Sequence, residues 1–140
     1  MLQTTSQLLS YHQQLEEKQS AMYQNLAHRY PQHSDVFESL TKDSLKHRDM
    51  AQRAYREGVT DAFEVGFLAN PLATEDFVLV ESDGDITTDV FTMISNEEII
   101  IRFCMDAALS SSKLLPDVPE TFERLVRRKK RGIERLRELI

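Results

Sequence analysis

Apolar side chains recur at helical spacing through the N-terminal part of the chain. From Thr5 to Arg29 they form one stripe made of Leu8, Leu15, Met22 and Leu26. This spacing is typical of an amphipathic helix, and Pro31 follows its expected end. A second stripe follows Ser34, a residue suited to capping a helix N-terminus, and runs to about Arg56. Because the connection is short, we expect an antiparallel helical hairpin over about 5–58.

Two further stripes predict a second hairpin over about 95–140. The run Ser95-Asn96-Glu97-Glu98 matches a capping box, so we expect the third helix to begin at Ser95 and to continue to about Ser110. The fourth helix is expected after Pro116 and Pro119. Its apolar positions at helical spacing are Phe122, Val126, Ile133, Leu136 and Ile140.

The two predicted hairpins resemble each other in sequence. The segment from Glu16 to Ala27 can be laid over the segment from Glu97 to Ala108 without a gap, and 37–40 can be laid over 122–125. Helical sequences are degenerate, so such matches also arise by chance. Taken with the order of the helices, the match indicates one hairpin present twice.

The segment of about 59–94 differs from the rest and joins the two hairpins. A connection of this length is expected when the second and third helices run parallel and the chain must cross the bundle between them. We therefore predict one all-α domain over 1–140, a four-helix bundle with a long crossover connection. Within the crossover, Asp61 to Leu68 is expected to form one or two helical turns. Phe77 to Val80 fits either an extended or a helical backbone.

Composition excludes several classes of protein. The 140 residues carry a net charge of -6, which disfavours general binding to nucleic acid. The longest apolar runs are far shorter than the roughly 18 residues of a membrane span, and the N-terminus lacks the apolar region of an export signal. A lone Cys104 excludes an intramolecular disulfide. Together these features predict a cytoplasmic protein outside the membrane.

Charge is unevenly distributed along the chain. Between Glu57 and Ile101 there are eleven acidic residues and no Lys or Arg, whereas eight basic residues lie between Arg124 and Arg137. One interpretation is intramolecular, with a basic helix face near the acidic connection and most charges solvated. The other is an acidic protein partner bound at the basic C-terminal helix.

Two carboxylates occupy matching positions of the predicted hairpins. Glu16 falls at the edge of the first apolar stripe, Glu97 does the same in the third helix, and their neighbours Glu17 and Glu98 point into solvent. Inward carboxylates on facing helices are the usual ligands of a metal site in a bundle core. Each could instead be an acidic residue at the edge of the apolar face without a metal role. Glu97 lies in the expected first turn of its helix, where the helix N-terminus favours a negative charge.

The second helix places an acid and an imidazole near its apolar face. Asp43 and His47 are four residues apart, and an inward pair of this kind needs either a metal or each other. His12, one turn before Glu16, could join that carboxylate in a mononuclear site. A lone buried His is more often a hydrogen-bonded core residue than a ligand, and Cys104 is expected to be buried and inert.

The order Glu16, Tyr23, Leu26-Ala27, Phe37, Leu40, His47 resembles the rubrerythrin branch of the ferritin-like superfamily. In that family each half supplies a Glu from its first helix and a Glu-x-x-His from its second, and together they hold two irons. The resemblance implies that Glu16, His47 and Glu97 are the metal-site positions retained in this chain. Other positions depart from the pattern: Ser44 and Lys129 stand where a Glu is needed, and Gly132 stands where the second His is needed.

These departures predict that the di-iron centre has been lost. Lys129 lies near the inward stripe of the fourth helix, where its ammonium would take the place of the cation and pair with Glu16 or Glu97. His47 is expected to hydrogen-bond to the same cluster or to Asp43.

Two function classes follow from the resemblance and from its departures. The first is a non-catalytic ferritin-like bundle with a structural or interaction role, no cofactor and a tendency to form homodimers. The alternative is a metal-binding oxidoreductase that handles iron, peroxide or oxygen through a reduced carboxylate-histidine site.

Overall fold

The chain folds as an all-α four-helix bundle, as the apolar spacing predicted. A computed structural model describes residues 1–59, 66–112 and 117–140. Its long helices are α1 (Thr5–Arg29), α2 (Ser34–Val59), α3 (Ile86–Ser110) and α4 (Asp117–Arg137). The bounds of α1 confirm the prediction from the sequence.

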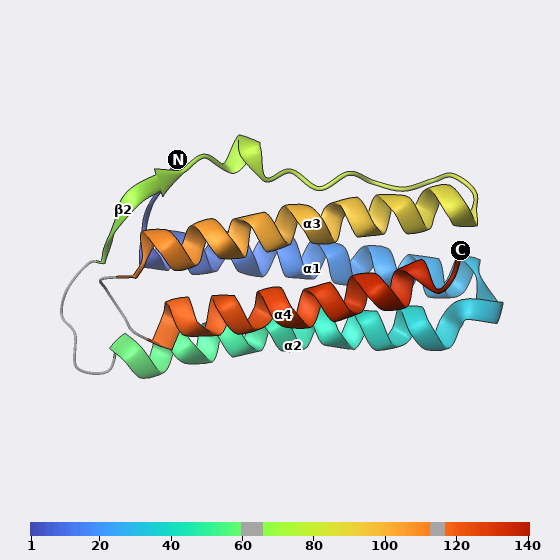
Figure 1. The fold of residues 1–140 in the computed structure, drawn as a ribbon, viewed down its shortest axis with the longest axis horizontal. Helices are drawn as coiled ribbons and strands as arrows, with labels where there is room; N and C mark the ends of the chain where they lie inside the picture. The colour runs from blue at the N-terminus through green and yellow to red at the C-terminus, as the bar shows by residue number, and fades with distance from the viewer. Residues whose placement is uncertain (60–65, 113–116) are drawn as a thin grey trace.

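The four helices surround one core, and the α3–α4 hairpin lies in front of the α1–α2 hairpin in the view of Figure 1. Helix α1 packs against α2 and α3, and α4 packs against the same two, so α1 and α4 are diagonal to each other. Both hairpins are antiparallel, whereas α2 and α3 run in the same direction. The chain therefore returns along the length of the bundle between them, as the length of the connection predicted.

Helix α3 begins nine residues earlier than expected, at Ile86. Its N-cap is Asp85, whose carboxylate accepts a hydrogen bond of 2.8 Å from the backbone N–H of Thr88. The predicted start at Ser95 is wrong because the capping-box pattern lies inside the helix, where Asn96 and Glu97 are buried. The crossover is correspondingly shorter than the predicted 59–94.

Helix α2 also begins differently from the prediction. A 3-10 turn over Pro31–His33 leads directly into it, and Ser34 has helical backbone angles of -58° and -37°. Ser34 is therefore the first helical residue rather than the extended N-cap that was expected.

The described part of the crossover contains a short strand that the sequence did not predict. β2 (Phe67–Leu72) pairs antiparallel with β1 (Leu2–Thr4) at the N-terminus. The helical turns expected for Asp61 to Leu68 fall largely outside the described residues, and the described end of that range is strand. Phe77 to Val80 has neither helix nor strand.

The described part of the crossover runs along the bundle beside α3 (Figure 1), and side chains of α1 and α3 hold it there. The amide of Asn96 pairs with the backbone of Val80, accepting from its N–H at 2.9 Å and donating to its C=O at 2.8 Å. Tyr11 donates its hydroxyl to the carbonyl of Phe77 at 2.6 Å, and the Phe77 ring meets Phe103 edge to face. The described part of the crossover around Phe77 and Val80 is thus packed against the bundle.

The helices are amphipathic around a core of aliphatic and aromatic side chains, with Phe37, Phe103 and Phe122 fully buried. Within the ranges that the structure describes, we find no helix whose length and apolar character match those of a bilayer span.

Candidate functional site

A buried lysine lies at the centre of the bundle. Lys129, on α4, is 1% exposed, and its Nζ lies 2.7 Å from Oε1 of Glu16 on α1 and 3.1 Å from Oε2 of Glu97 on α3. The side chain therefore reaches its diagonal helix and joins three of the four helices through one ammonium group. The pairing of Lys129 with Glu16 or Glu97 that the sequence predicted is present with both residues.

The positions of the two carboxylates along their helices explain why they meet. Glu16 and Glu97 each lie eleven residues after the first residue of a 25-residue helix. Helices α1 and α3 pack against each other in opposite directions, so only positions near the middle of both helices lie at the same height, and Glu16 and Glu97 are both near the middle. Glu17 and Glu98 are exposed, as the helical period predicted.

Glu16 is held in its ionised form. Burial alone would raise its pKa, but the Lys129 ammonium and a hydrogen bond to His12 outweigh burial and lower the pKa to about 2. The partner atom on His12 is Nε2, 2.9 Å from Oε2 of Glu16. His12 and Glu16 are both fully buried. Each carboxylate oxygen of Glu16 has its own partner, Lys129 at Oε1 and His12 at Oε2.

Glu97 has partners for both of its oxygens too. Its Oε1 accepts hydrogen bonds from the Tyr23 hydroxyl and from Nε2 of Gln19, each at 3.1 Å, while Oε2 faces Lys129. Burial and the negative charge of Glu97 raise the pKa of Tyr23 well above its usual value, so Tyr23 remains a donor. Gln19 in turn accepts from Asn96 at 3.3 Å, which links the cluster to the crossover.

Lys129 itself remains protonated. Burial opposes its charge, but the Glu16 and Glu97 carboxylates overcome that effect and raise the Lys129 pKa above its ordinary value. An ammonium group has three hydrogens to donate, and two of them are directed to carboxylates here. The group acts as a fixed cation and lacks the unprotonated form that a nucleophile or a base would need.

His47 faces this cluster but is not hydrogen-bonded as expected. Its buried Nδ1 has no hydrogen-bond partner among the described residues. Asp43 does not supply one, because it is partly exposed and pairs with Arg135 at 3.1 Å. Burial and the neighbouring Lys129 charge lower the pKa of His47 to about 3, so the ring is neutral at pH 7.

The side chains around Lys129 do not fit a di-iron centre. The space between the two carboxylates is taken by an ammonium nitrogen, and a second cation there would be repelled by it. Across the described residues, no group of three or more His, Cys, Asp or Glu side chains is arranged to hold a metal ion. Cys104 is buried beside the cluster, and burial raises the pKa of its thiol.

A second polar cluster, which the sequence did not reveal, fastens the far end of the crossover. The fully buried carboxylate of Asp89 accepts hydrogen bonds from the Tyr30 hydroxyl at 2.5 Å, from the backbone N–H of Gly84 at 2.9 Å and from Ser82. Arg29 adds an ion pair at 3.0 Å. Burial opposes the charge, yet these bonds lower the pKa of Asp89 below its usual value. The cluster joins α1, α3 and the crossover.

Sequence reasoning also missed Gln19 and Asn96, which carry the hydrogen bonds outward from Glu97. For Gln19, the available signal in the sequence was a polar residue about one turn after Glu16 that falls on the apolar stripe of the first helix. Asn96 gave no separate signal because it stood inside the supposed capping box.

Comparison with known proteins adds no relative. No protein-family model matches the chain, and no curated protein or solved structure matches it either.

Proposed function

We propose that this protein is a non-catalytic bundle of the ferritin-like, rubrerythrin-like type, with a structural or interaction role and with Lys129 in place of the iron. The observation that carries this proposal is the position of Nζ of Lys129, within hydrogen-bond distance of both Glu16 and Glu97. A buried cation of the chain's own neutralises the carboxylates, so the core is complete without a metal or a cofactor.

Three features support a structural role for the cluster. Both carboxylates have their oxygens occupied, the lysine is kept protonated, and the neighbouring thiol and tyrosine have pKa values raised by burial. The pKa values of Glu16, Lys129, Cys104 and Tyr23 are all displaced away from neutral pH, so none of these four groups is poised for the proton exchange that general acid–base chemistry requires. A buried ionic cluster in which Lys129, Glu16 and Glu97 are paired with one another suits a role in fixing how the helices meet.

The duplicated hairpin supports the ferritin-like assignment. Two inward carboxylates at equivalent levels, on the first helix of each half, are retained along with His47 on the second helix. The chain differs at Ser44, Lys129 and Gly132, where the family pattern has ligands. The proposal explains both observations by loss of metal chemistry from an iron-binding bundle.

The experiment combines metal analysis with one substitution. The protein is purified from cells supplied with iron and manganese, as wild type and as Lys129→Glu, with Lys46→Glu as an exposed control. We expect substoichiometric metal in the wild type and in the control. If Lys129→Glu gains iron, the side chains around position 129 have kept the arrangement of a metal site, and the wild type lacks only the carboxylate at that position. Stoichiometric iron in the wild type would overturn the proposal and favour the metal-binding oxidoreductase.

A further inference from the structure

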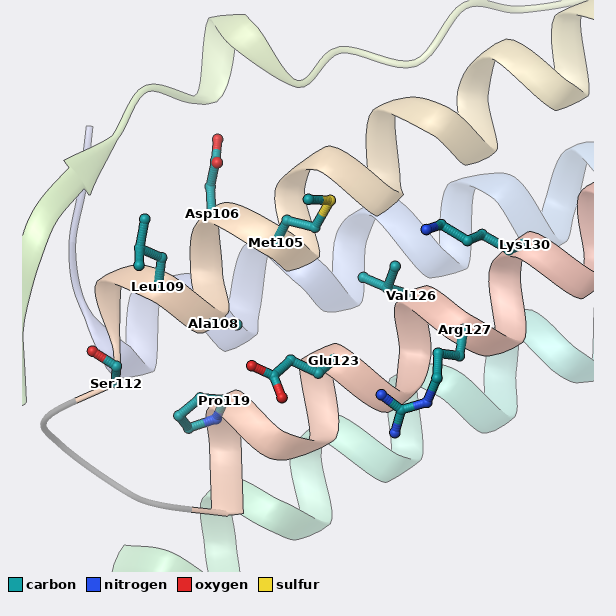
Figure 2. A pocket seen from close by; sticks show the side chains of 10 residues that line it. All are labelled: Met105, Asp106, Ala108, Leu109, Ser112, Pro119, Glu123, Val126, Arg127 and Lys130. Carbon is teal, nitrogen blue, oxygen red and sulfur yellow. The ribbon is translucent and has the colours of Figure 1, made fainter.

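An open groove runs along the outer side of the α3–α4 hairpin. It has a volume of about 580 Å³ and is formed where Met105 and Leu109 of α3 face Val126 of α4 (Figure 2). Leu109 is 70% exposed and Met105 is 56% exposed, although both are large apolar side chains. Exposed apolar surface that is gathered in a groove is typical of a contact surface.

Charges flank the apolar strip in an ordered way. Asp106 and Glu123 lie toward the end of the groove where Ser112 and Pro119 are found, whereas Arg127 and Lys130 lie toward the other end (Figure 2). The ion pairs of α4 within the described chain involve other residues, at positions 120, 124, 129, 134, 135 and 137. Asp106 of α3 has no ion pair or hydrogen bond either, so all four groove charges are without a partner among the described residues.

The arrangement is complementary to itself. A two-fold axis that crosses the helix pair near the middle of the groove exchanges its acidic and basic ends. In such an arrangement Glu123 of one copy would face Arg127 of the other and the apolar strips would meet between them, while the Asp106 side chain projects from α3 away from α4 (Figure 2). Interfaces of symmetric dimers have this form, in which one surface patch is its own partner. An acidic protein would satisfy Arg127 and Lys130 but would be repelled by Asp106 and Glu123.

We propose that the groove between α3 and α4 binds a second copy of this chain, which forms a two-fold symmetric dimer. This inference rests on the interaction role proposed above and names the partner. It does not depend on the Lys129 cluster, because the groove opens to solvent through its exposed residues, such as Met105, Leu109 and Arg127, while Ala108 and Val126 are buried.

The first test measures molecular mass in solution. Sedimentation equilibrium of the purified full chain, from low to high micromolar concentration, is expected to show a monomer–dimer equilibrium that weakens with salt. Leu109→Asp places a charge on the apolar strip of the interface and is expected to raise the dissociation constant by on the order of tenfold or more. Phe91→Asp is the matched control, since Phe91 is 58% exposed on the same helix but does not line the groove.

The second test uses the predicted charge pairs. Glu123→Arg and Arg127→Glu each place like charges opposite one another in a homodimer, so each variant alone is expected to dissociate. Mixing the two variants restores both pairs, and a heterodimer is expected to form. Circular dichroism of each variant checks that the helices are intact.

Several results would overturn the inference. They are a wild type that stays monomeric at every concentration, a dimer that Leu109→Asp leaves as tight as Phe91→Asp does, and charge variants that fail to associate when mixed. A monomer that binds polyglutamate through Arg127 and Lys130 would also overturn it, in favour of an acidic partner. None of these results alters metal content, so a failure here is distinguishable from a failure of the proposed function.

Discussion

Lys129 and Glu16 form an ion pair across the diagonal of the bundle, with Nζ 2.7 Å from Oε1 and both side chains fully buried. Glu97 of a third helix, α3, also pairs with Lys129, at 3.1 Å. Breaking such a pair is costly because the remaining charge stays buried without compensation.

Lys129→Met is therefore expected to destabilise the fold strongly. Methionine keeps much of the length and the helix preference of lysine but leaves Glu16 and Glu97 without their cation. We expect the free energy of unfolding to fall by about 3–5 kcal/mol, measured by urea denaturation. Lys46→Met makes the same chemical change at an exposed position of α2 and is expected to stay within about 0.5 kcal/mol of the wild type. Equal effects of the two substitutions would contradict a central role for Lys129.

A double-mutant cycle isolates the contribution of Glu97. Glu97→Gln removes the charge and keeps most of the shape, so in the Lys129→Met background it removes an unpaired buried anion. We expect Glu97→Gln to destabilise the wild type but to cost less, or to stabilise, in that background, with a coupling of about 0.5–3 kcal/mol. Strict additivity of the two changes would show that the charges do not interact.

Stability is expected to decline as pH falls, first through His47 and then through Glu16. The folded-state pKa of His47 is about 3 against an ordinary 6.5, so below pH 6.5 the unfolded chain takes up a proton that the folded chain refuses. Glu16 adds to the decline between pH 4.5, its ordinary value, and about 2, its folded value.

Urea denaturation across this pH range, with His47→Leu, measures the first part. The substitution is expected to flatten the decline between pH 6.5 and 4.5 and to leave stability at pH 7 unchanged or raised, because it removes a buried nitrogen without a partner. His28→Leu changes an exposed imidazole and is the control. A slope that His47→Leu leaves intact would refute the assignment.

Asn96→Leu is expected to release the crossover from the bundle. Leucine is close to asparagine in size but leaves the N–H and C=O of Val80 without their partner, at a cost of about 1–3 kcal/mol. We expect the Val80 amide to lose protection from hydrogen exchange while the amides of α2 keep theirs. Ser95→Ala, at an exposed neighbouring position, should preserve the protection of Val80. If Asn96→Leu also preserved it, the pairing would not be what holds the crossover.

The helices could be predicted because apolar spacing alone determines which face of each is buried. That period placed Glu16 and Glu97 inward, placed their neighbours outward and brought Lys129 to the core. The N-terminus of α3 could not be located in this way. Ser95 starts a valid capping sequence, and only tertiary packing shows that Asp85 caps the helix and that Asn96 is buried.

The polar contacts of the site could not be predicted in full, because the helical period shows which face a residue is on but not how far it lies from residues of other helices. Asp43 and His47 share a helix face at four-residue spacing, yet Asp43 forms its ion pair with Arg135 of α4. Nδ1 of His47 is left without a hydrogen-bond partner among the described residues. The strand pairing of β1 with β2 was missed for the same reason, because it joins residues far apart in the chain.

The most direct test of the account is a crystal structure of protein purified from iron-supplied cells, with anomalous diffraction recorded at the iron edge. The account predicts Nζ of Lys129 between the carboxylates of Glu16 and Glu97, with no anomalous peak in the core. Iron bound among those carboxylates, with Lys129 turned out toward solvent, would contradict it.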